Sequence, residues 1–350
     1  MSLMRTIIKI SAAVGVLALA GCTSTGTPND AGSTTASSQV ALGEGVTDYP
    51  LTMENCGTTV TVESTPERAV TLNQAAAEIL IHLGVSERIV GTGYEIDQVP
   101  DDIAAEYDAI PLLGVDGATI AHETLLSAQP DFVYSQFASF LTADQSGERE
   151  ELHQLGVPTY LTEFDCVMHG SVDNASFELM YQEYEDLAAI FDVPGAGEEL
   201  IAEQKAVVDD GLATAEGIEG TPTLMWFYST YGGTPYMAGP GGLPQHVTEL
   251  VGAANVFDDA STKWPETSWD EVAARNPDVI ILADLTRGEP GDTAQEKIEI
   301  LKGDPLTSQL DAVKNDRFII VPGRYMDPSY GSVYSVPAVA EGLVELQQQP

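Results

Sequence analysis

Hydrophobic and polar positions along the chain predict short strands that alternate with helices, beginning near residue 69. Apolar runs of three to six residues predict the strands, and apolar positions at helical spacing predict the helices between them. The first series has predicted strands over 69–73, 89–94, 132–136 and 159–164, and predicted helices over 75–83, 120–129, 148–155 and 177–191. Ahead of this series, alternation over 49–62 with a turn at Asn55-Cys56-Gly57 predicts a hairpin.

A second series of the same kind begins near residue 223. Its predicted strands are 223–229, 279–283 and 318–321, and its predicted helices are 244–253, 268–276, 294–301 and 337–348. Ser268 and Glu271 have the spacing of a capping box, which places a helix start at Ser268. Pro277 then stops that helix.

Alternating strands and helices predict an α/β fold with parallel sheets covered by helices on both faces. Two series therefore predict two doubly wound lobes. Between them, apolar residues at helical spacing from 198 to 215 predict one long helix that bridges the lobes. We divide the chain into an N-terminal lobe (48–194), a connecting helix (195–216) and a C-terminal lobe (217–350). Because ligands bind beyond the carboxyl ends of the strands in such sheets, we expect a ligand cleft between the lobes.

The N-terminus has the pattern of an export signal. Arg5 and Lys9 precede an apolar stretch over 10–20, which is shorter than the roughly 20 residues that span a bilayer. It ends in Leu19-Ala20-Gly21-Cys22, which resembles the bacterial lipobox. We expect cleavage of a signal peptide over 1–21 and lipidation of Cys22, which would hold the protein on the outer face of the cell membrane. The alternative is an ordinary secretory signal with a chance cysteine.

The segment that follows Cys22 is rich in threonine, serine, glycine and alanine. It has almost no large apolar side chain with which to offset the entropy of ordering, so we predict a flexible tether over 22–47.

Two cysteines remain, Cys56 and Cys166. Outside the cell an even pair most simply forms a disulfide. This disulfide would close a loop of about 110 residues, for which the chain-entropy model gives roughly 4–5 kcal/mol. The alternative is two separate buried thiols.

The chain is strongly acidic, with a formal net charge of −40 and only 14 lysines and arginines. Such a charge argues against nucleic acid and against an anionic membrane surface as binding partners. It favours a neutral or cationic ligand or a high-salt habitat. A solvated acidic surface without meaning for the ligand is the alternative.

Candidate ligand-binding residues follow the predicted strands. Aromatic side chains there could cover a large apolar ligand, and arginines could pair with anionic oxygens. The candidates are Asn73, Gln74, Tyr94, Ser135 and Phe137 in the first lobe, and Tyr228, Tyr231, Trp264, Arg287, Arg324 and Tyr325 in the second.

Six segments of the chain carry a family resemblance. They are 66–73 (PERAVTLN), 78–91 (EILIHLGVSERIVG), 125–133 (LLSAQPDFV), 249–257 (ELVGAANVF), 276–281 (NPDVII) and 312–318 (AVKNDRF). In this order they resemble the periplasmic-type binding proteins for iron–siderophore complexes and vitamin B12, over nearly all of 66–349. The resemblance implies two rigid lobes with little hinge motion, joined by one long helix. It also implies a monomer that delivers its ligand to the permease and ATPase of an ABC importer and needs no cofactor.

The family places one acidic residue on each lobe that docks onto arginines of the permease. By position these residues are Glu123, before Leu125, and Glu249, before Leu250. Exposed carboxylates can pair with guanidinium groups and fix the register of two proteins. The alternative is that both are ordinary glutamates on a helix surface.

The ligand within this family is not fixed by the sequence. Because only Arg287 and Arg324 lie in suitable places, a weakly charged ferric siderophore of hydroxamate type fits better than an anionic tris-catecholate. The five histidines form no cluster along the sequence, which disfavours a bare metal site. Haem stays open, because a tyrosine or His169 could ligate its iron. Cobalamin or another chelate is a further alternative.

No catalytic motif stands out. The sequence has no nucleophile elbow, phosphate-binding loop, dinucleotide-binding glycine pattern or paired acids. We therefore expect no enzyme activity. A surface enzyme without a recognisable motif, or an adhesin, is the alternative from another class.

Overall fold

The two series of strands form two separate sheets in the computed structural model, which describes residues 43–114, 118–166 and 175–349. The N-terminal lobe holds a sheet of four parallel strands in the order β4-β3-β5-β6. These strands are β3 (Ala69–Thr71), β4 (Ile89–Gly91), β5 (Phe132–Ser135) and β6 (Thr159–Leu161). The helices of this lobe are α1 (Gln74–His82), α2 (Ala104–Asp108), α3 (His122–Ser127), α4 (Arg149–Gln154), α5 (Glu163–Cys166) and α6 (Phe177–Ile190).

The C-terminal lobe holds a mixed sheet in the order β11-β10-β7-β8, with β9 also paired to β7. All pairs are parallel except β7 with β8. The strands are β7 (Thr223–Tyr231), β8 (Thr234–Met237), β9 (Ala254–Asn255), β10 (Val279–Asp284) and β11 (Phe318–Pro322). The helices are α8 (Leu243–Leu250), α9 (Trp269–Arg275), α10 (Ala294–Gly303), α11 (Asp311–Lys314) and α12 (Ser335–Gln348). Ser268 caps α9 by accepting a hydrogen bond from the Glu271 amide, as its spacing predicted.

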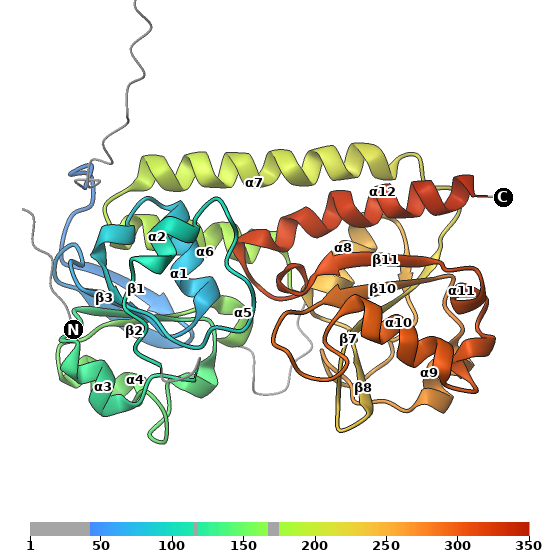
Figure 1. Ribbon diagram of the computed structural model, residues 1–350. Coiled ribbons are helices and arrows are strands. Elements are labelled where there is room, and N and C mark those ends of the chain that lie inside the picture. The colour runs from blue at the N-terminus through green and yellow to red at the C-terminus, as the bar shows by residue number, and fades with distance from the viewer. Residues whose placement is uncertain (1–42, 115–117, 167–174, 350) are drawn as a thin grey trace, which may run out of the picture. The chain divides into compact units, whose positions relative to one another are not determined.

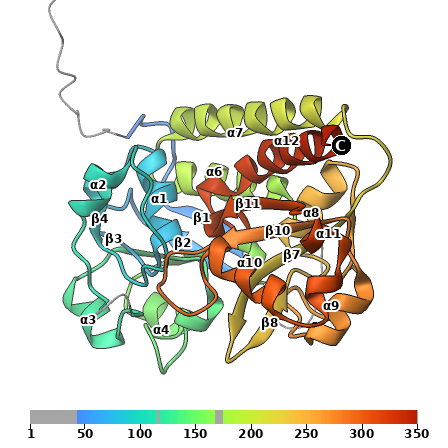
Figure 2. The ribbon, with the colours of Figure 1, turned by 45° about the vertical axis from the view of Figure 1, so that its right-hand side comes forward.

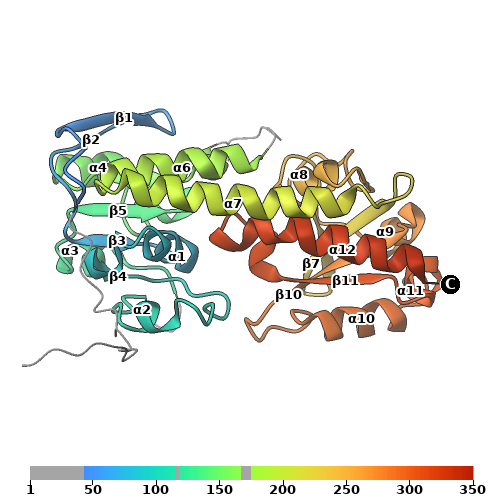
Figure 3. The ribbon, with the colours of Figure 1, turned by 90° about the horizontal axis from the view of Figure 1, so that it is seen from above.

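A single long helix, α7 (Pro194–Ala215), runs between the lobes (Figure 1 and Figure 2). It packs against α6 in the N-terminal lobe and against α12 in the C-terminal lobe (Figure 3). Gly211 is needed for the second contact, because a Cβ atom there would lie 2.6 Å from the backbone nitrogen of Pro337. The α/β fold with two lobes and one bridging helix is therefore confirmed, while the residue limits of the lobes stay predictions.

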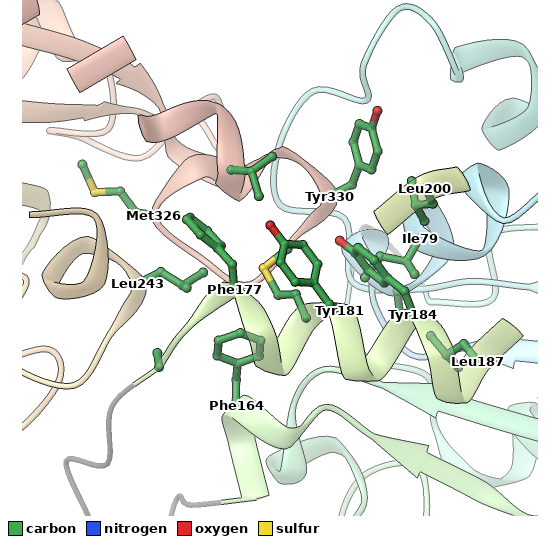
Figure 4. Packing of buried hydrophobic residues seen from close by; sticks show 14 of the residues in the cluster. Ile79, Phe164, Phe177, Tyr181, Tyr184, Leu187, Leu200, Leu243, Met326 and Tyr330 are labelled. Atoms are coloured by element: carbon green, nitrogen blue, oxygen red, sulfur yellow. The ribbon is translucent and has the colours of Figure 1, made fainter. Parts of the chain in front are cut away.

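One apolar core passes from lobe to lobe. Phe177 and Tyr181 on α6 belong to the same cluster of buried side chains as Leu243 and Met326 of the C-terminal lobe (Figure 4). Tyr330 lies in this cluster as well, and its ring stacks on His82 of α1 with the ring centroids 3.4 Å apart. The lobes are thus joined by packed side chains as well as by α7.

The hairpin of β1 (Leu51–Asn55) and β2 (Thr58–Val62) turns at Cys56 and Gly57, as predicted. Cys56 is bonded to Cys166 in a disulfide, the pair expected from the sequence. Asn55 adds a hydrogen bond of 2.8 Å to the carbonyl of Leu161 at the end of β6. The hairpin is therefore fastened to the edge of the N-terminal sheet.

Residues 43–47, the last five of the predicted tether, are bound to the N-terminal lobe. The carboxylate of Asp192 accepts hydrogen bonds from the backbone amides of Gly45, Val46 and Thr47 at 2.6–2.8 Å. These hydrogen bonds, from Thr47 first, hold the pKa of Asp192 below its ordinary value. The rest of the tether, the signal peptide and Cys22 lie outside the described residues. Within the described residues, no helix is both long and apolar enough to cross a membrane.

Candidate functional site

A cleft lies between the two lobes. Its lining comes from both: Asn73, Gln74, Ala75, Glu78, Tyr94, Ile96, Asp97, Gln136 and Phe137 on the N-terminal side, and Leu285, Gly323, Arg324, Asp327, Pro328 and Ser329 on the C-terminal side.

The position of the cleft follows from the sheets. Asn73 and Gln74 come just after β3, Tyr94 after β4, and Phe137 after β5. On the opposite wall, Arg324 comes just after β11. Parallel strands place their carboxyl ends at one edge of a sheet, and ligands bind beyond that edge. The expected location of the cleft is therefore where the structure has it.

Hydrogen bonds fix the N-terminal wall. The side-chain oxygen of Asn73 accepts the backbone amide of Gln136 at 3.0 Å, which ties the loop after β3 to the loop after β5. The side-chain oxygen of Gln74 accepts the amides of Ile96 and Asp97 at 3.1 and 3.2 Å. The other end of the Gln74 amide donates to Glu78 at 2.9 Å. Gln74 thus positions both the loop after β4 and the Glu78 carboxylate.

Aromatic rings line the N-terminal wall of the cleft and lie close to the C-terminal wall. Tyr94 packs edge-to-face on Phe137 and Phe140, with centroids 5.8 and 4.8 Å away. In the C-terminal lobe, Tyr228 packs on Trp264 at 4.9 Å. Such pairs give a rigid apolar surface that costs little side-chain entropy on binding.

Arg287 is held by its own lobe. Its guanidinium pairs with Asp292 at 2.5 Å and donates to the hydroxyl of Tyr231 at 2.8 Å. Burial acts to lower the pKa of Arg287, but these two contacts outweigh it and raise the pKa. The guanidinium carbon of Arg287 also lies 5.5 Å from the ring centroid of Tyr228. Much of its charge is therefore compensated before any ligand arrives.

Two carboxyl groups in the cleft have raised pKa values. Burial raises the pKa of Glu78 to about 7, although the Gln74 hydrogen bond and the charge of Arg324 act to lower it. Loss of water likewise raises the pKa of Asp327 to about 6, against a hydrogen bond of 3.3 Å from the hydroxyl of Tyr228.

Hydrogen bonds cross from lobe to lobe at the mouth of the cleft. The hydroxyl of Thr286 donates to Asp97 and accepts the amide of Gln98 at 2.9 Å. At another place, the ammonium of Lys263 donates to the carbonyl of Phe164 at 3.3 Å. These contacts add polar links to the shared apolar core.

The structure brings together five of the eleven candidate residues as direct lining of the cleft: Asn73, Gln74, Tyr94, Phe137 and Arg324. Ser135 is buried, and its hydroxyl donates to the carbonyl of Phe137. Tyr228 contacts the lining through Asp327, whereas Tyr231 and Arg287 are hydrogen-bonded to each other and do not line the cleft. Trp264 packs behind Tyr228, and Tyr325 lies 5.5 Å from the Arg324 guanidinium.

Sequence reasoning missed the three carboxylates of the lining, Glu78, Asp97 and Asp327. A signal for Glu78 was present, because it lies four residues after Gln74 and so on the same face of α1. Asp97 and Asp327 lie in loops several residues beyond a strand, where no spacing rule points to the cleft.

Glu123 on α3 and Glu249 on α8 are both exposed to solvent. The side-chain amide of Gln245 donates to Glu249 at 2.7 Å.

Four of the five histidines lie in the described residues and His169 lies outside them. Among the described residues, one group of three side chains could hold a metal ion: Cys56, Glu163 and Cys166. Its two cysteines are joined in the disulfide.

The sequence model of a family described as periplasmic binding protein matches residues 70–325. This chain belongs to that family. Its members are solute-binding proteins, which work outside the cytoplasm with the permease and ATPase of ABC importers. Every element of the cleft except the last few lining residues falls within the match.

Individual relatives of this periplasmic binding protein are distant. The vitamin B12-binding protein of Vibrio parahaemolyticus is 24% identical over 237 residues, which is 67% of this chain and 77% of that protein. A periplasmic binding protein of Veillonella parvula is 25% identical with a TM-score of 0.72, and the match covers 84% of this chain and 97% of that one. The structure of an ABC-type Fe3+-hydroxamate transport system from Saccharomonospora viridis is 25% identical with a TM-score of 0.69, covering 84% and 99%.

Glu78→Gln should stabilise the protein at neutral and alkaline pH. Between the ordinary pKa of 4.5 and about 7, the folded protein keeps a proton that the unfolded chain has lost, so stability falls as the pH rises through this window. The glutamine variant lacks this loss and should gain up to about 3 kcal/mol above pH 7 and little at pH 4.5. Urea unfolding at both pH values measures the difference. Glu345→Gln, an exposed change of the same charge on α12, should leave the profile unaltered. Parallel pH profiles for wild type and Glu78→Gln would contradict the burial argument.

Proposed function

We propose that this protein captures a ferric siderophore of hydroxamate type outside the cytoplasm and delivers it, as a monomer, to an ABC permease. The observation that carries the ligand class is the scarcity of cations around the cleft. Arg287 is paired with Asp292, and Arg324 is the one cationic side chain in the cleft lining among the described residues. A ferric tris-catecholate carries several negative charges and needs several cations. The metal centre of a ferric trihydroxamate is neutral and does not.

The rings and amides of the cleft suit such a chelate. Tyr94 and Phe137 on one wall, and Tyr228 with Trp264 near the other, offer apolar faces to the organic backbone of the chelate. Arg324 can donate to the oxygens of the hydroxamates. In this proposal Asn73, Gln74 and Tyr231 contact ligand directly, while Ser135, Arg287 and Tyr325 hold the contacting groups in place. The likeness to the Fe3+-hydroxamate protein of Saccharomonospora viridis supports the same ligand class.

Cobalamin is the second candidate. It is favoured by the match to the vitamin B12-binding protein of Vibrio parahaemolyticus. The corrin is also broad and apolar, so the aromatic walls do not separate it from a hydroxamate chelate. Haem carries two carboxylates, which the acidic lining opposes.

Titration of the intrinsic tryptophan fluorescence should therefore show selective binding. Trp264 packs against Tyr228 near the cleft, so an iron chelate bound there should quench it. We expect a ferric trihydroxamate to bind with a Kd of about 1 µM or tighter, which corresponds to roughly −8 kcal/mol. A ferric catecholate and haem should bind much more weakly. Binding of cobalamin alone would replace the siderophore with the second candidate, and the absence of binding by every chelate would overturn the proposal.

We also propose that Glu123 and Glu249 dock this protein onto the permease, as the family resemblance implies. Their exposure and their positions on separate lobes support the proposal. The double variant Glu123→Ala and Glu249→Ala should reduce uptake of the chelate to background while its Kd stays unchanged. Uptake is measured with radioactive iron in cells that depend on this protein, and Glu345→Ala serves as the control. Normal uptake by the double variant would show that docking uses other residues.

Lipidation at Cys22 completes the proposal, since it would hold the receptor beside its permease at the outer face of the membrane. Cys22→Ser should release the protein from the membrane fraction into the medium or periplasm. Immunoblotting of the fractions measures the release, and mass spectrometry of the wild-type N-terminal peptide should find the acyl chains. A serine variant that stays in the membrane fraction would contradict a lipid anchor. Because the family consists of solute-binding proteins, the proposal includes no catalytic step.

A further inference from the structure

The cleft lining is acidic. Three carboxylates, Glu78, Asp97 and Asp327, face a space to which the lining of the described chain adds one guanidinium, that of Arg324. The carboxylates come from both lobes, since Glu78 and Asp97 belong to the N-terminal wall and Asp327 to the opposite wall. A ligand between the lobes therefore faces carboxyl groups on both walls.

Glu78 is the least expected of the three. Its residue is 2% exposed, and its hydrogen bond comes from the neutral amide of Gln74. Within the described part of the chain it forms no ion pair, and Arg324 acts on it only from a distance. A buried carboxyl group without a cationic partner is costly to ionise. Its presence in a ligand cleft is explained when the ligand supplies the cation.

Asp327 shows the same pattern on the other wall. It accepts a hydrogen bond from the phenol of Tyr228 and forms no ion pair in the described residues. The charge of Arg287 acts on Asp327, but the guanidinium of Arg287 pairs with Asp292 at 2.5 Å. Arg324 also lines the cleft, and in the described residues it forms no ion pair with Asp327.

We propose that the ligand carries a cationic arm, and specifically that it is a ferric trihydroxamate with a free primary ammonium group that Glu78 and Asp327 receive. This inference rests on the function proposed above and narrows it. The iron centre of such a chelate is neutral and lies against the aromatic rings. The ammonium donates charge-assisted hydrogen bonds to the carboxylates. The net charge of −40 also raises the local concentration of a cationic ligand near the protein.

A matched pair of chelates tests the arm. Ferrioxamine B has a free ammonium group, and its N-acetylated form is the same chelate without that charge. A hydrogen bond to a charged group contributes about 1.5–3 kcal/mol, so ferrioxamine B should bind roughly 10- to 100-fold more tightly to the full-length protein. Added salt should reduce the ratio of the two affinities if solvent reaches the ion pair between the ammonium and the carboxylates.

Variants assign the effect to the two carboxylates. Glu78→Gln with Asp327→Asn should bring the ratio close to 1, because ferrioxamine B then loses the charge-assisted hydrogen bonds that the acetylated form never makes. Glu345→Gln is the control for charge, because the Glu345 side chain is exposed on α12 and lies outside the cleft lining. Retained binding of the acetylated chelate shows that the double variant is folded.

The outcomes separate the two proposals. Equal affinity of wild type for both chelates would overturn the cationic arm and leave the proposed function intact. A preference that persists in the double variant would overturn the assignment to Glu78 and Asp327. If neither chelate binds, nor any other ferric hydroxamate, the proposed function itself fails.

Discussion

The apolar core that both lobes share sets the geometry of the cleft. Phe177 and Tyr181 from one lobe are buried among Leu243 and Met326 from the other. Rotation of the lobes apart would bring these side chains into water, at about 1.5–3 kcal/mol for each large apolar side chain that becomes fully exposed. Several such side chains together resist a hinge motion far beyond thermal energy. We therefore expect the two walls to keep a nearly fixed separation, which the close contact of α7 with α12 at Gly211 supports.

If the two walls keep their separation, recognition of the ligand depends on the side chains at the ends of the strands. Asn73 and Gln74 are themselves held by backbone amides of neighbouring loops, and Gln74 in turn orients Glu78. The sheet thus orders the loops, and the loops order the polar groups of the cleft. A receptor built in this way distinguishes ligands by shape and charge in a preformed site, with little contribution from closure.

The sequence predicted β3, β5 and β10 well because each is a short apolar run that is almost entirely buried. It failed where a signal was brief or ambiguous. The strand β8 was not predicted. Gly232 and Gly233 precede it, have positive φ and form the hairpin turn between β7 and β8. The strand predicted to reach Phe164 ends at Leu161, and the turn of helix α5 follows. Among the candidate site residues, the pairing of Arg287 with Asp292 could not be predicted, because the sequence does not specify the path of the loop that holds both residues.

The acidic residues of the chain point to a ligand only where their carboxyl groups are buried. A net charge of −40 could not identify a ligand, since exposed carboxylates are solvated at little cost. Glu183 shows why burial alone is also insufficient. It is 1% exposed and burial raises its pKa to about 7, as for Glu78, but hydroxyl groups of Tyr134 and Thr162 donate to its two oxygens. Those donors satisfy Glu183 inside the N-terminal lobe, and Glu183 itself does not line the cleft, which is the pattern of a structural carboxylate. Glu78 has the same burial with one neutral donor and an open cleft in front of it. The difference between the two glutamates lies in their surroundings, and it is this difference that points to a cation brought by the ligand.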